Sequence, residues 1–199
     1  DTSMSSRLRQ PLIILSPLAV LVLGQLTIRL LVPIWGTWSW LPFWLFYILL
    51  LGFFIGLNGG AKSIHSWLVP SRGHWLWAVL ACGIPVAMTL PIFLPNWKLL
   101  LSPQVLLSTF VFVVLNPLVE EFYWRGTLLD ATKTWQSWLS VAYTVLTFAL
   151  HHLWIGVIAA AGRHPAALAG PILMGTVWAL TYKATGSLRL PIAGHILAN

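Results

Sequence analysis

Long apolar runs with very few charges most strongly limit how this chain can fold. Charged residues make up 8% of the 199-residue sequence, and hydrophobic residues make up 58%. A soluble domain carries about 25% charged residues, and a disordered chain combines low hydrophobicity with high charge. Runs such as LPFWLFYILLLGFFIGL also lack the apolar–polar alternation of transmembrane barrel strands. The sequence therefore predicts an all-α, polytopic membrane helix bundle, whose helices satisfy their own backbone hydrogen bonds.

About seven apolar segments are separated by short connections that contain glycine, proline or charge. We predict transmembrane helices over the ranges 11–32, 39–58, 75–94, 104–131, 138–159, 166–183 and 188–199. No connection is long enough to separate two units, and no internal repeat is apparent. Residues 1–199 are therefore expected to form a single integral-membrane domain. The last segment stops at Asn199, so we expect the final helix to be short or trimmed.

The net charge of +7 comes from basic residues that are scattered singly between the apolar segments. A nucleic-acid-binding protein would gather them in a patch or stripe, so we predict no nucleic-acid partner. With the N-terminus inside, the cytoplasmic set is Arg7, Arg9, Lys62, Arg72, Lys133, Lys183 and Arg189, and the opposite set is Arg29, Lys98 and Arg163. Because cytoplasmic loops are enriched in Lys and Arg, we predict a multi-pass protein of a bacterial plasma membrane with a cytoplasmic N-terminus.

Three charges lie inside the fourth apolar segment, in the stretch NPLVEEFYWRG. A charge at the bilayer centre costs about 2.5–3.5 kcal/mol on insertion scales and usually marks a functional site. Glu121 and Arg125 are four residues apart on one helix face, and we predict a structural ion pair between them. Glu120 points about 100° away and has no partner within the motif. Removal from water disfavours a charged carboxylate, so Glu120 is the candidate general base.

Two later segments carry polar side chains at a similar predicted depth. His152 lies in the fifth segment, and His195 and Asn199 lie four residues apart in the last one. With a rise of 1.5 Å per residue, Glu120 and His152 each lie about 18–22 Å from the connection between their segments. An antiparallel hairpin brings them to a common depth, and the last segment begins from the same side. We therefore predict that three segments converge on one buried polar site.

The fifth segment offers two adjacent histidines, His151 and His152. We favour His152, because Phe148 lies four residues earlier on the same helix face, and we expect His151 to face elsewhere. A single histidine in a membrane helix is often only an interhelical hydrogen-bonding group. The convergence of several polar residues is less easily explained in that way than any one of them.

Such a set suits hydrolysis of an acyl bond by water. Glu120, assisted by His152, would take a proton from water, and His195 and Asn199 would donate hydrogen bonds to the resulting oxyanion. Zinc is an alternative, with Glu120, His152 and His195 as its ligands. The HExxH spacing of many zinc proteases is absent, so the sequence predicts no definite cofactor.

These residues resemble the motifs of the CAAX-protease and bacteriocin-processing (CPBP) family of intramembrane proteases. Residues 120–126 match its EExxxRG motif, residues 148–152 its FxxxH motif, and residues 195–199 its HxxxN/D motif. The resemblance covers roughly residues 104–199. It implies a helical membrane core whose enclosed site is reached from the cytoplasmic side. It also implies hydrolysis of a peptide or protein substrate, lipidated or not, by a glutamate-type or metallo-type endopeptidase.

The resemblance further implies that Glu120 and His152 activate water, that His195 and Asn199 hold the oxyanion, and that the supporting residues are Glu121, Arg125 and Phe148. Two alternatives stay open: a non-catalytic membrane scaffold and a proton-coupled transporter, in which buried Glu and His are also typical. The EExxxRG spacing and the lack of an internal repeat favour the protease. Substrate identity and oligomeric state stay open.

Overall fold

The computed structural model describes residues 6–73, 75–101, 103–158 and 163–199. The first part of the chain forms α1 (Ser6–Trp35), η1 (Gly36–Ser39), α2 (Trp40–Leu57), α3 (Ala61–Trp67), α4 (Leu76–Ala78), η2 (Val79–Gly83), α5 (Ile84–Asn96) and η3 (Trp97–Leu101). The second part forms α6 (Pro103–Glu121), η4 (Phe122–Thr127), α7 (Leu128–Ala131), α8 (Ser137–His151), η5 (His152–Trp154), α9 (Ile155–Ile158), η7 (Pro165–Leu168), α10 (Ala169–Thr185) and α11 (Arg189–Ala198). Every regular element in the described residues is helical, which confirms the predicted all-α class.

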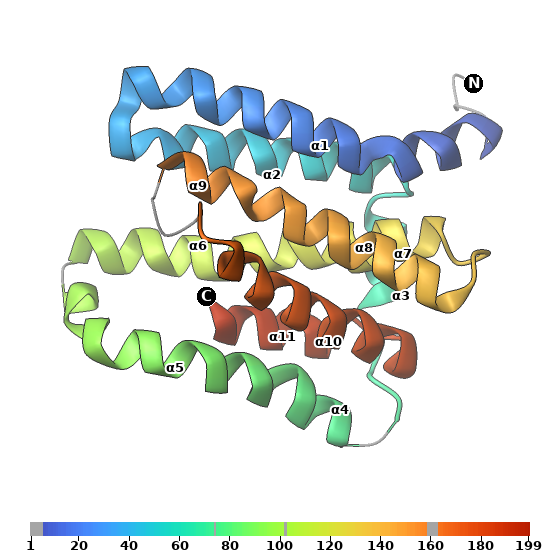
Figure 1. Ribbon diagram of the computed structural model, residues 1–199. Coiled ribbons are helices and arrows are strands. Elements are labelled where there is room, and N and C mark those ends of the chain that lie inside the picture. The colour runs from blue at the N-terminus through green and yellow to red at the C-terminus, as the bar shows by residue number, and fades with distance from the viewer. Residues whose placement is uncertain (1–5, 74, 102, 159–162) are drawn as a thin grey trace.

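The helices form a bundle in which α1, α2, α5, α6 and α8 run roughly along one common direction, as Figure 1 shows. Three stretches of the described residues are long and apolar enough to cross a membrane: Leu8–Trp35, Trp40–Leu57 and Ser137–Ile158. Large apolar side chains on them face outward; Leu49 is 73% exposed. A contiguous apolar exterior suits lipid rather than water. The remaining predicted segments also contain helix, although an exact count of seven crossings stays a prediction.

The basic residues assigned to the cytoplasmic side lie in segments at one end of the bundle. The right-hand half of Figure 1 holds the start of α1, the short helix α3, the connection from α7 to α8 and the corner between α10 and α11. The connections from α1 to α2 and from α5 to α6 lie at the left-hand end. Helices that cross a membrane in alternating directions place successive connections at opposite ends of the bundle, as these connections are placed. The cytoplasmic position of the N-terminus stays a prediction.

The short helix α3 lies in a region that the sequence predicts only as a connection. Its last residue, Trp67, is buried and donates an indole hydrogen bond to Asp130 Oδ2 at 2.7 Å. Tyr182 donates to the other oxygen of that carboxylate at 3.2 Å, and the Leu188 amide donates to the Trp67 carbonyl at 2.8 Å. A seven-residue helix is too short to be stable alone. These tertiary contacts stabilise α3, and no local sequence pattern reveals them.

Directly after Glu121 the α6 helix widens into the π-helical turn η4. Such turns are rare and occur frequently at functional sites. Within η4, Gly126 lies against the Trp67 ring, where an added Cβ would come within 2.7 Å of a ring carbon. The glycine of the EExxxRG motif therefore allows α3 to pack closely against this turn.

Candidate active site

Glu120 is a buried carboxylate at the end of α6, with 3% of its surface exposed. Its Oε1 accepts a hydrogen bond from the Tyr47 hydroxyl of α2 at 2.8 Å. Its Oε2 has no hydrogen-bond partner among the described residues and lies 3.5 Å from His195 Nε2. One oxygen of Glu120 is thus held by Tyr47, and the other lies next to His195 without a hydrogen bond to the described residues.

Glu121 forms the predicted ion pair and also makes a second contact. Its Oε1 accepts a hydrogen bond from Arg125 Nη1 at 2.9 Å and another from His195 Nδ1 at 2.8 Å. A carboxylate only accepts hydrogen bonds, so Nδ1 of His195 carries a hydrogen and Nε2 is turned toward Glu120. Glu121 therefore orients His195 as well as neutralising Arg125, a role that helix spacing did not predict.

The Arg125 guanidinium is fully buried between aromatic rings. Its Cζ lies 4.2 Å from the centre of the Phe148 ring and 5.4 Å from the Trp178 ring, which are favourable cation–π distances. Its Nε and Nη2 have no hydrogen-bond partner in the described chain. Gly175 leaves space beside this group, because a Cβ there would lie 3.1 Å from Nη2.

His195 is held by the close approach of α11 to η2. An added Cβ at Gly194 would overlap the carbonyl oxygen of Ala81, so only glycine allows this approach. The same carbonyl accepts a hydrogen bond from the Trp178 indole at 3.1 Å. The Trp178 ring stacks on the His195 ring, with centroids 4.3 Å apart. The imidazole therefore has a fixed plane as well as a fixed hydrogen-bond partner.

His152 begins the tight turn η5 that follows α8. Its Nδ1 lies 2.9 Å from the Phe148 carbonyl oxygen, which can only accept, so Nδ1 donates. Nε2 then carries the lone pair and makes no hydrogen bond to the described residues. The rings of Phe148 and His152 are also in contact, with centroids 4.7 Å apart. The predicted placement of Phe148 against His152 is present.

The expectation that His151 faces away from the site is wrong. His151 stacks on Tyr47, with centroids 4.1 Å apart, and both residues line the same cavity as His152. The α-helix ends at His151, and the chain tightens into a 3₁₀ turn at His152. Because 3₁₀ and α geometry differ in residues per turn, ideal α-helical spacing does not place these two side chains correctly.

A cavity of about 210 Å³ brings the four predicted catalytic residues together. Its lining includes Glu120, His152, His195 and Asn199. Asn199 is exposed at the end of α11, and its backbone amide donates to the His195 carbonyl at 3.3 Å. The predicted convergence of three segments on one polar site is therefore present in the fold.

The cavity extends from Glu120 toward the end of the bundle where α1 meets α2. Trp40, the first residue of α2, belongs to its lining, together with Phe112 and Ile155. On the other side of Glu120, Arg125 of the EExxxRG motif and Leu128 of α7 are fully buried. Under the predicted orientation the cavity therefore lies toward the non-cytoplasmic end, whereas the resemblance implies access from the cytoplasmic side.

Sequence reasoning missed several cavity residues, and three of them form hydrogen bonds within the site: Trp44, Tyr47 and Asn116. Tyr47 and Trp44 lie on α2, outside every motif, and only the fold brings them to Glu120. Asn116 lines the cavity from α6 and accepts a hydrogen bond from the Trp44 indole at 3.1 Å. Asn116 precedes Glu120 by four residues, so its helix face was a usable signal.

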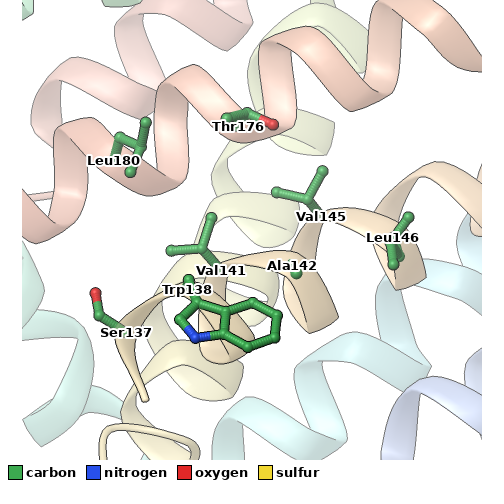
Figure 2. Close-up of a pocket in the computed structure, with 8 residues that line it drawn as sticks. All are labelled: Ser137, Trp138, Val141, Ala142, Val145, Leu146, Thr176 and Leu180. Atoms are coloured by element: carbon green, nitrogen blue, oxygen red, sulfur yellow. The ribbon is translucent and has the colours of Figure 1, made fainter. Parts of the chain in front are cut away.

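A larger groove of about 690 Å³ lies between α8 and α10 (Figure 2). Its lining consists of the apolar side chains Trp138, Val141, Ala142, Val145, Leu146 and Leu180, with the hydroxyls of Ser137 and Thr176. It contains no acid or base, so it does not provide the chemistry of the smaller cavity.

The zinc alternative requires three donor side chains that converge on one ion. No group of three or more His, Cys, Asp and Glu side chains in the described parts of the chain has a metal-binding arrangement. Tyr47 donates to Glu120 Oε1, and His195 Nδ1 donates to Glu121. A metal-binding histidine commonly donates its other ring N–H to a carboxylate, so these two contacts do not decide between a glutamate-type and a metallo-type enzyme.

A comparison with known protein families matches residues 102–199 to the family described as type II CAAX prenyl endopeptidase Rce1-like. No curated protein and no solved structure matches the chain. The matched range contains Glu120, His152, His195 and Asn199, whereas α2, with Trp44 and Tyr47, precedes it.

Proposed function

Because the chain belongs, through residues 102–199, to the Rce1-like family of type II CAAX prenyl endopeptidases, we propose that it hydrolyses peptide bonds with water activated at Glu120. The family and the apolar helices make it a CAAX-type protease of the membrane. The catalytic residues and the mechanism at Glu120 are our proposal.

The unpartnered Oε2 of Glu120 carries this proposal. A buried carboxylate oxygen almost always has a hydrogen-bond partner, and this one is next to a cavity of about 210 Å³. One water molecule occupies about 30 Å³ in the liquid, so the cavity accommodates a water molecule beside a peptide group. The partner of Oε2 is then the attacking water, with the free Nε2 of His152 as its second contact.

In the first step Glu120 Oε2 takes a proton from this water as its oxygen attacks the scissile carbonyl carbon. A carbon–oxygen bond forms, and the carbonyl electron pair moves onto the oxygen to give an oxyanion. His195 and Asn199 donate hydrogen bonds to the oxyanion. His195 Nδ1 already donates to Glu121, so its Nε2 serves as this donor when both ring nitrogens carry hydrogen.

In the second step the oxyanion returns its electron pair, and the carbon–nitrogen bond breaks. The proton held by Glu120 passes to the leaving amine, so the products are a carboxyl group and an amine. Water supplies the only new oxygen, and no covalent intermediate forms on the chain. Tyr47 keeps the other oxygen of Glu120 fixed through both proton transfers. The substrate is a peptide or protein tail presented at the membrane.

This proposal is tested by incubating the purified protein, in detergent micelles, with a fluorogenic peptide library. Matched CAAX peptides with and without a prenyl chain resolve the substrate class. We expect cleavage that is lost in Glu120→Ala and His152→Ala. Cleavage that persists in both variants would contradict the catalytic assignment. A proton flux in liposomes that depends on Glu120, without peptide cleavage, would favour the transporter. Chelator treatment followed by metal analysis tests the metallo alternative.

A further inference from the structure

We propose that Asn116 is a further oxyanion donor, which binds the scissile carbonyl oxygen of the substrate through its amide nitrogen. This inference rests on the proposed function, because it assigns a role within the same peptide hydrolysis. Asn116 belongs to none of the EExxxRG, FxxxH and HxxxN/D motifs, although it lies four residues before the first of them.

Asn116 has the location that such a donor requires. It lies on α6 one helical turn before Glu120, so the two side chains share a helix face. Only 7% of its surface is exposed, and it lines the cavity that contains Glu120 and His152. Neighbouring side chains at this spacing have Cβ atoms about 5–6 Å apart. A carbonyl group attacked by water on Glu120 is therefore within reach of the Asn116 amide.

Trp44 fixes which end of this amide faces the cavity. The Trp44 indole nitrogen lies 3.1 Å from Asn116 Oδ1, and an indole N–H only donates. The oxygen of the amide must therefore face Trp44, which turns Nδ2 the other way. The contact with Trp44 uses only the amide oxygen, so it leaves the two N–H groups of Nδ2 as donors. Because Asn116 lines the cavity, a peptide carbonyl that enters it can accept a hydrogen bond from Nδ2.

The two donors assigned to the oxyanion, His195 and Asn199, are each less well placed than a buried and fixed donor would be. His195 contacts carboxylates with both nitrogens, at 2.8 Å to Glu121 and 3.5 Å to Glu120. Asn199 is exposed at the end of α11. Oxyanion stabilisation depends on donors that are fixed before the reaction in a site shielded from water. Asn116 satisfies both conditions, because it is buried and its orientation is set by Trp44.

Trp44 is then a positioning residue supplied by α2, ahead of the range that matches the family. It is 8% exposed, and its ring packs against Phe112 of α6 with centroids 5.8 Å apart. This packing keeps the indole N–H aimed at Asn116. The first part of the chain thus contributes to the site through Trp44 as well as through Tyr47.

This inference is tested by steady-state kinetics. The substrate is a peptide that the wild-type protein cleaves. Asn116→Asp keeps the shape and the acceptor for Trp44 but replaces the NH₂ donor with oxygen, and Asn116→Leu removes both. We expect kcat to fall about 100- to 1,000-fold in each, as for other oxyanion donors, with KM changed less than about threefold. Trp44→Phe should lower kcat about tenfold alone and should add nothing in the Asn116→Leu background, because both act through one hydrogen bond.

Leu115→Ala is the matched control, because Leu115 neighbours Asn116 but is 46% exposed on the outer face. It should leave kcat unchanged, and the thermal midpoints of all variants should lie within a few degrees of the wild type. A kcat within about threefold of wild type in Asn116→Leu, or a rise in KM alone, overturns the inference. If Glu120→Ala is inactive in that case, only the role of Asn116 fails. If the wild type itself cleaves no peptide, the proposed function fails together with this inference.

Discussion

The Tyr47 hydroxyl donates a hydrogen bond to Glu120 Oε1 at 2.8 Å, and the Tyr47 ring stacks on the His151 ring, so α2 contributes directly to the site. We predict that Tyr47→Phe, which removes only the hydroxyl, lowers kcat about 10- to 100-fold, since a hydrogen bond to a charged group contributes about 1.5–3 kcal/mol. Peptide cleavage rates in micelles provide the measurement. Trp124→Phe, which removes the 3.3 Å contact to the same hydroxyl, should have a smaller effect. An unchanged kcat in Tyr47→Phe would show that this contact does not hold the general base.

We expect substitutions of the two adjacent histidines to change kcat by different amounts, although both residues line the cavity. His152 presents a free Nε2, because its Nδ1 donates to the Phe148 carbonyl, whereas His151 stacks on Tyr47. We expect His152→Phe to lower kcat about 100- to 10,000-fold, the usual contribution of acid–base assistance. His151→Phe preserves the stacking and should keep most of the activity. The opposite ranking of these two variants would transfer the role to His151.

We expect substitutions of Glu121 and Arg125 to lower the thermal stability by amounts that do not add. Both side chains are fully buried, and removing one partner of a buried pair destabilises by about 3–5 kcal/mol. Glu121→Gln and Arg125→Met should therefore each lower the thermal midpoint in micelles, and the double variant should lose less than the sum. Lys133→Met, on an exposed loop residue, is the control. Strictly additive losses would contradict an ion pair that is maintained by mutual neutralisation.

Gly126 should tolerate no side chain while Trp67 is present. A Cβ at this position would come within 2.7 Å of the indole ring, and overpacking of this kind costs about 1–3 kcal/mol. We predict a lower thermal midpoint for Gly126→Ala and partial recovery when Trp67→Leu is added. Gly52→Ala, at a helix position with nothing within 4 Å, is the matched control. Equal midpoints for both single variants would contradict the close packing of α3 on the motif.

The predictable part of this protein is the part that follows from local patterns. Apolar runs locate the helical segments, and the four-residue spacing locates the Glu121–Arg125 pair. The position of each polar residue along its helix was enough to predict that Glu120, His152 and His195 line one cavity. Each of these features depends on a single helix or a single hairpin.

The remaining features depend on contacts between distant parts of the chain. Tyr47 reaches Glu120 across 73 sequence positions, and Trp67 reaches Asp130 across 63, so no motif contains either pair. His151 was misplaced because the helix tightens at His152. The second contact of Glu121, with His195, requires the tertiary position of α11. Such pairings cannot be predicted from one sequence, because its spacing determines only which residues share a helix face.

The central claim is that Glu120 is the general base while its neighbour Glu121 supports the structure. The most direct measurement compares kcat and thermal midpoint for Glu120→Gln, which preserves shape and removes only the basic carboxylate. The account predicts a fall in kcat of about 100-fold or more with a thermal midpoint near that of the wild type. Cleavage by Glu120→Gln at the wild-type rate, from a protein that is equally stable, would contradict it.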